Sequence, residues 1–137
     1  INQGPGVFAV RSEMIHDARI FPIDNTAHLT KKLSLYHGDS RAHWEGDTLV
    51  VTTANFRPMV FRSATEKMRL TERFRRVDAG TLMYEFTVDD PQTWTRPWTV
   101  QFPMTHSKEP VYEYACHEGN YSLPGILAGA REAEKSR

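Results

Sequence analysis

The chain has 137 residues, of which 39% are hydrophobic and 25% charged, and its 17 basic side chains balance 17 acidic ones. This size and composition are typical of one globular domain with its own core and exclude an intrinsically disordered chain. The charge balance gives no electrostatic support for nucleic-acid binding, and no apolar run approaches the roughly 18 residues of a membrane-spanning helix. We therefore predict a single domain over residues 1–137, with no nucleic-acid partner and no membrane span.

The first predicted element is one long extended stretch over residues 7–23, ended by Pro22 and the turn-prone Asp24-Asn25. Alternate residues of a strand share a face. The more apolar face then consists of Met14, His16, Ala18 and Ile20. This pattern predicts that His16 points inward.

A β-hairpin is predicted next, with arms at residues 36–45 and 48–54. The Gly46-Asp47 pair between them is typical of a two-residue hairpin turn. In this register one face is apolar and belongs to the core: Ala42, Trp44, Leu49 and Val51. The opposite face is polar and carries Asp39, Arg41, His43 and Glu45.

A second hairpin is predicted from residues 68–77 and 81–89, with Asp78-Ala79-Gly80 as a three-residue loop. This loop length opposes Phe74 to Tyr84 and Arg73 to Glu85. A shift of one residue would turn every side chain to the other face, which favours the register that keeps the apolar face intact. Glu72 then lies among apolar neighbours: Leu70, Phe74, Tyr84 and Phe86.

The C-terminal third continues with a strand that begins at Trp98 and a further strand at residues 111–117, in which Tyr112, Tyr114 and Cys116 alternate. Residues 122–135 have the apolar spacing of a short helix. About eight strands with short connections predict an all-β fold. We expect an antiparallel up-and-down barrel or a strongly curved sheet, lipocalin- or calycin-like, with a short C-terminal helix.

The main candidate site is centred on Glu72. A carboxylate on an apolar face must be paired, hydrogen-bonded, protonated or solvated in a cavity, and Arg76 on the same face offers a pairing cation. A lumen with aromatic walls and a few polar groups is typical of a small-molecule site. The predicted ligand-binding residues are His16, Glu72, Arg76, Tyr84, Tyr112 and Tyr114. The alternative is a structural ion pair near a barrel rim.

A second candidate cluster consists of Arg41, His43 and Glu45 on the polar face of the first hairpin. A histidine beside a carboxylate is suited to general acid–base chemistry, whereas the alternative is a solvated strand face. No metal site is predicted, because histidines at ligand spacing are absent and Cys116 is the single cysteine. We predict no cofactor.

Five ordered segments together resemble a family of uncharacterised bacterial proteins that is common in soil and environmental genomes. The segments lie at residues 14–20, 38–41, 43–51, 90–98 and 114–121. The resemblance implies export to the periplasm or the medium, and a longer precursor whose upstream part is missing here. It implies no activity and no catalytic residue. Ala42 stands where that family is expected to have glycine.

Three functions follow as alternatives. The first is binding of a small apolar or aromatic molecule in a β-barrel lumen. The second is a lyase, isomerase or hydrolase that uses a histidine–carboxylate pair on the same barrel. The third is a structural module that packs against a missing upstream segment.

Overall fold

The computed structural model describes residues 1–24, 26–30, 33–59, 61, 63–115 and 117–135. These residues form two antiparallel sheets, one α-helix and a short 3-10 helix (Met14–His16), and the strand orders are β1-β2-β3 and β4-β5-β6-β7-β8. The elements are β1 (Asn2–Gly4), β2 (Val7–Arg11), β3 (Ala18–Pro22), β4 (Asp39–Glu45), β5 (Thr48–Ala54), β6 (Arg69–Arg76), β7 (Thr81–Asp89), β8 (Trp98–Thr105) and α1 (Ser122–Lys135). The mostly β, antiparallel prediction is confirmed, and the described residues form two sheets and no closed barrel.

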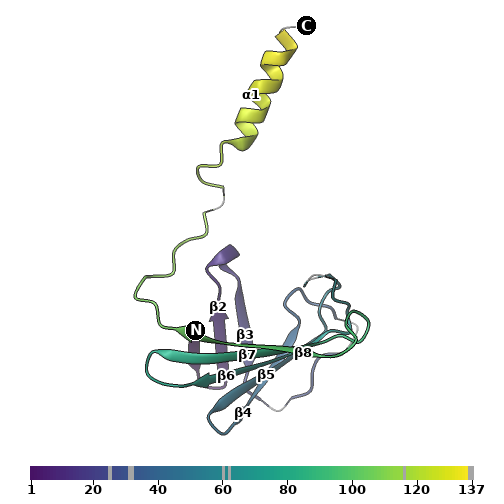
Figure 1. Cartoon of the computed structure of the whole chain (residues 1–137), viewed down its shortest axis with the longest axis vertical. Coiled ribbons are helices and arrows are strands. Elements are labelled where there is room, and N and C mark those ends of the chain that lie inside the picture. Colours follow the sequence, from purple (N-terminus) through teal and green to yellow (C-terminus); the bar gives the residue numbers. More distant parts are fainter. Residues whose placement is uncertain (25, 31–32, 60, 62, 116, 136–137) are drawn as a thin grey trace.

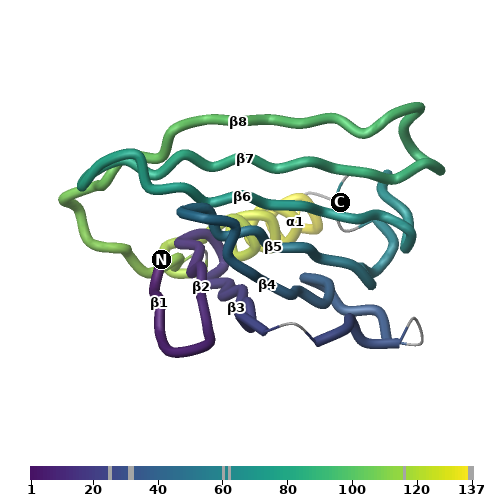
Figure 2. The backbone as a smooth tube through the Cα atoms, turned by 90° about the horizontal axis from the view of Figure 1, so that it is seen from below, coloured from purple at the N-terminus to yellow at the C-terminus, as the bar shows by residue number. Residues whose placement is uncertain are grey.

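The main core lies where the small sheet packs on one face of the large sheet. The strands of the two sheets cross at a steep angle (Figure 1), and an isolated bridge joins Ile23 to Ala42. The buried residues of this core come from both sheets: Phe8, Phe21, Ala42, Leu49, Val51 and Phe74. Figure 2 shows the five strands of the large sheet side by side, with β8 at the edge farther from the small sheet.

Both predicted hairpins are confirmed. Trp44 opposes Leu49 in the first, and Phe74 opposes Tyr84 in the second. Gly46 has a φ of 61°, which is the left-handed conformation that its turn requires. The buried residues Ala42, Leu49, Val51 and Phe74 share one face of the large sheet, and Glu72 lies on that face, as predicted. Trp44, predicted to belong to the core, is 46% exposed. Val50, on the opposite face, is also buried.

The prediction of a single extended stretch over residues 7–23 is wrong. The chain reverses between β2 and β3 through a turn closed by a 2.7 Å hydrogen bond from the Ser12 N–H to the Asp17 carbonyl. Because β3 begins after this turn, the alternation of inward and outward side chains in β3 is shifted by one residue from the predicted pattern. Phe21 is fully buried and Ile20 is exposed, the reverse of the expected pattern.

A second, smaller core lies at the other end of the same face, where Phe56, Ala64, Met68 and Val88 are buried. The side chain of Asp90 links the loop before β6 to the loop after β7 at this smaller core. The carboxylate accepts hydrogen bonds from the Thr65 N–H (2.6 Å), the Thr65 hydroxyl (3.0 Å), the Gln92 N–H (3.1 Å) and the Thr93 hydroxyl (3.0 Å). Burial raises the pKa of Asp90, but these hydrogen bonds outweigh burial, and its pKa lies below the usual value.

This shift predicts a pH-dependent effect of Asp90→Asn. A carboxyl whose pKa is lowered by folding stabilises the protein above its unfolded pKa of about 4, and this contribution is lost as the pH falls through the folded value. We expect the substitution to cost about 1–3 kcal/mol at pH 6 and clearly less at pH 3. Urea unfolding at both pH values measures the difference, with Asp47→Asn in the exposed hairpin turn as control. An equal cost at both pH values would contradict the assignment.

The C-terminal part lies apart from the sheets. The predicted strand at residues 111–117 is wrong for the described residues 111–115 and 117, which contain no strand, and residue 116 lies outside the described residues. The helix is confirmed over Ser122–Lys135, and Figure 1 shows it projecting away from the sheets. A strand needs a partner to satisfy its backbone, and this segment does not pair with the β8 edge. None of the described helices is both long and apolar enough to cross a bilayer.

Candidate functional site

Glu72, in the middle of β6, is the most buried charged residue that the structure describes. It lies on the core face between its register partners Val51 and Phe86. Arg19 on β3 donates two hydrogen bonds to its carboxylate, from Nη1 to Oε1 (2.9 Å) and from Nη2 to Oε2 (2.5 Å). The Tyr84 hydroxyl donates a third, to Oε1 (2.7 Å). These three hydrogen bonds use three of the roughly four lone-pair directions of the carboxylate.

The surroundings of Arg19 and Tyr84 fix the charge states of these two side chains. Burial lowers the pKa of Arg19, but hydrogen bonding and attraction from Glu72 outweigh burial and raise it. Burial raises the pKa of the Tyr84 hydroxyl, and the Glu72 carboxylate raises it further. Arg19 therefore stays charged and Tyr84 stays a neutral donor. The Arg19 side chain is 22% exposed, and its guanidinium carbon lies 4.8 Å from the centre of the Phe21 ring.

An open cleft of about 250 Å³ lies directly beside this triad, on the same face of the large sheet. We call it the aromatic cleft. Arg19, Glu72 and Tyr84 form its polar side. The rest of its lining is mainly apolar and aromatic: Tyr36, His37, Phe56, Phe61, Met68, Leu70, Phe86 and Val88. The cleft combines the guanidinium of Arg19, the hydroxyl groups of Tyr36 and Tyr84, and aromatic walls, which is the usual composition of a small-molecule pocket.

The structure brings two of the six predicted ligand-binding residues, Glu72 and Tyr84, into this cleft. Arg76 is not the partner of Glu72, because four residues along a strand separate the two by about 13 Å. Arg76 instead lines a different hollow, beside Trp44 and Leu82. Its predicted role as the pairing cation is wrong, and Arg19 has that role.

The other three predicted residues lie outside the aromatic cleft. His16 lies in the turn between β2 and β3, where its ring is 6.1 Å from that of Tyr114. Tyr112 is exposed and donates to the Glu109 carboxylate at 3.2 Å. The predicted inward orientation of these residues required strands at residues 14–16 and 111–115, and the structure describes no strand at either place. The inward orientation predicted for His16, Tyr112 and Tyr114 is therefore wrong.

The second predicted cluster divides into two. His43 Nε2 lies 3.1 Å from Glu45 Oε1, and Arg73 bonds Glu45 Oε2 at 2.5 Å, all at the exposed end of the hairpin. These neighbours, Arg73 first and then His43, lower the pKa of Glu45. Arg41 points elsewhere, to Asp39 at 2.7 Å. This arrangement favours a solvated face for His43 and Glu45.

A more buried histidine–carboxylate pair, His28 and Asp39, lies at the other end of the polar face. Asp39 is buried and accepts hydrogen bonds from Arg41 and from the Leu29 N–H (2.7 Å). Its Oδ2 lies 3.1 Å from His28 Nδ1, and His28 Nε2 lies 3.2 Å from the Thr52 hydroxyl. Asp39, His28 and Thr52 thus form a continuous chain, which we call the His28 relay. Nothing in the local sequence pairs His28 with β4, because it belongs to a loop.

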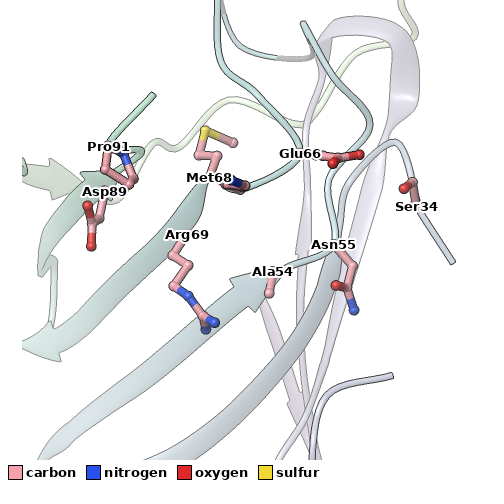
Figure 3. A pocket seen from close by; sticks show the side chains of 9 residues that line it. Ser34, Ala54, Asn55, Glu66, Met68, Arg69, Asp89 and Pro91 are labelled. Carbon is pink, nitrogen blue, oxygen red and sulfur yellow. The ribbon is translucent and has the colours of Figure 1, made fainter. Parts of the chain in front are cut away.

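A third hollow, of about 380 Å³, lies at the ends of β5, β6 and β7 (Figure 3). Arg69 and Asp89 come from paired positions on β6 and β7, and Asn55 follows β5. Glu66 and Lys67 add one further charge of each sign. These polar side chains are exposed or half-buried, which is typical of a solvated surface and unlike the desolvated Glu72 triad.

The described residues contain no group of three or more His, Cys, Asp or Glu side chains placed to hold a metal ion. A scan against protein-family models and searches of curated proteins and of solved structures found no match to this chain. The resemblance to exported bacterial proteins thus stays a prediction.

Proposed function

We propose that the protein binds a small apolar or aromatic molecule in the aromatic cleft, with Arg19 and Tyr84 as polar contacts. The observation that supports this is a fully buried carboxylate, neutralised by Arg19, at the side of a hollow with aromatic walls. A purely structural ion pair requires no hollow beside it. The volume lies just below the usual range for ligand pockets, which favours a compact molecule of one or two rings.

Glu72 has an indirect role in this proposal. Its carboxylate is shielded from solvent and accepts the hydrogen bonds of Arg19 and Tyr84. Glu72 therefore positions these two side chains, which reach the cleft. The open face of the five-stranded sheet takes the place of the lumen in a lipocalin-like barrel. Export to the periplasm or the medium belongs to the same proposal and is supported by the family resemblance alone.

A fluorescence titration with the neutral probe N-phenyl-1-naphthylamine tests the proposal. Tyr36 lines the cleft and is 57% exposed, whereas Tyr121 is 79% exposed and does not line it. Tyr36→Ser and Tyr121→Ser are therefore a matched pair of substitutions, and neither removes a buried side chain. Loss of one aromatic contact weakens binding by about two- to tenfold. We expect this loss for Tyr36→Ser and unchanged binding for Tyr121→Ser. Absence of saturable binding to the wild-type protein contradicts the proposal.

The His28 relay supports a second candidate function, hydrolysis of an ester. His28 would accept the Thr52 hydroxyl proton while Thr52 Oγ1 bonds the acyl carbon, and would return that proton to the departing alkoxide. Water would then cleave the acyl–threonine ester and regenerate the hydroxyl. Asp39, which faces His28 Nδ1, would hold the ring in the required orientation.

Turnover of p-nitrophenyl acetate tests this second function. Loss of a general base reduces a rate by about a hundredfold or more. We expect that reduction for His28→Gln and none for His106→Gln, which changes an exposed histidine outside the relay. Equal rates for the two variants and the wild type would contradict an enzymatic role of His28.

A further inference from the structure

The chain exposes far more surface than a folded monomer of its mass. Its accessible area is 10337 Å² at 15.8 kDa. The area expected for a compact monomer of this mass is about 7,300 Å², which leaves an excess of about 3,000 Å². The C-terminal segment explains the excess, because Figure 1 shows α1 and the chain before it extending away from the sheets.

The helix α1 has an apolar face without a partner among the described residues. Leu123, Ile126 and Leu127 follow the spacing i, i+3, i+4 and are all exposed. No residue of α1 is buried. A lone helix of this length is marginal in water, and Gly125 and Gly129 lower its propensity further. Its stability therefore calls for an apolar surface to pack against.

A matching apolar strip lies on β8. Val100 and Phe102 are 38% and 41% exposed on the face that carries the aromatic cleft, and Phe102 contacts Tyr84 edge-on at a ring distance of 5.3 Å. We call these two residues the β8 strip. Among the described strands, β8 pairs only with β7. Pro103 lacks a backbone N–H, which disfavours a further strand at this edge and favours contact through side chains.

We propose that two copies of the chain exchange their C-terminal segments, so that the apolar face of α1 from each copy packs on the β8 strip of the other. Residues 106–121, at about 3.3 Å per residue, can span about 50 Å, which is enough to reach a second copy. The exposed excess of about 3,000 Å² per chain is about 6,000 Å² for two copies, which is more than the roughly 2,000–5,000 Å² that stable homodimers bury over both partners. The partner's helix would then cover the side of the aromatic cleft next to β8.

Light scattering coupled to size-exclusion chromatography tests this proposal on the full chain, from low to high micromolar concentration. We expect twice the 15.8 kDa chain mass for the wild type. Ile126→Glu/Leu127→Glu places two charges on the apolar face and is expected to give a monomer. Ala128→Glu places one on the opposite face of α1 and should leave the dimer intact. Val100→Lys should restore dimerisation of the Ile126→Glu/Leu127→Glu variant in part.

A monomer at every concentration would overturn the proposal, and so would a dimer that survives Ile126→Glu/Leu127→Glu. A compact monomer, in which α1 packs on its own sheet, would overturn it equally. Probe binding by the monomeric variant is measured separately. Because light scattering reports the mass of the particle and the titration reports probe binding, failure of the dimer and failure of ligand binding are distinguishable.

Discussion

Arg19→Met is expected to lower the free energy of unfolding by about 3–5 kcal/mol, because it leaves the Glu72 carboxylate buried without its cation. Glu72 is fully buried, and two of the three side-chain hydrogen bonds that its carboxylate accepts come from Arg19. The single remaining donor, Tyr84, does not compensate a negative charge. Urea unfolding at neutral pH measures the loss.

The matched control removes both charges. Arg19→Met/Glu72→Leu replaces the pair with apolar side chains of similar volume, and such replacements are often close to neutral. The double variant should therefore be more stable than Arg19→Met alone. Arg75→Met, at an exposed position of β6, should change stability by less than about 0.5 kcal/mol. If Arg19→Met is as mild as Arg75→Met, Glu72 is not held in a desolvated pair.

Gly38→Ala is expected to cost about 2–5 kcal/mol, from two independent causes. Gly38 has a φ of +69°, and an added Cβ would lie 2.6 Å from Thr53 Cγ2 and 2.8 Å from the Ala54 carbonyl oxygen. This close approach places the start of β4, and with it Asp39, against β5. Thermal or urea unfolding measures the cost.

Gly6→Ala separates the two causes. Gly6 has nearly the same φ, +70°, but an added Cβ there would meet no atom within 4 Å. Its substitution should cost only the backbone strain, about 1–2 kcal/mol. Equal losses for Gly38→Ala and Gly6→Ala would show that the contact with β5 contributes nothing.

Much of the large sheet could be predicted from the sequence. Gly46-Asp47 and Asp78-Ala79-Gly80 are local turn signals, and each specifies the register of the strands on either side. Alternation then places Glu72 on the apolar face beside Tyr84, as the structure confirms. These features depend on neighbours close in the chain, where turn chemistry and side-chain alternation act together.

The partners of Glu72 could not be predicted in the same way. Arg19 faces inward because a turn at residues 12–17 shifts the alternation by one, and that turn carries no glycine or proline signal. Tyr36 and His37 reach the cleft from a loop, and His28 meets Asp39 across a loop without periodicity. The tyrosines at 112 and 114 alternate like a strand, but neither belongs to a strand in the part of the chain that the structure describes.

Nuclear Overhauser effects between N-phenyl-1-naphthylamine and methyl-labelled protein test most directly whether the aromatic cleft binds a small molecule. The methyl groups of Met68, Leu70 and Val88 line the cleft, whereas those of Leu123, Ile126 and Leu127 lie on α1. We predict contacts from the probe to the first group at saturating probe concentration. Contacts to the α1 methyl groups alone, or none to the cleft, would contradict the proposed ligand-binding function.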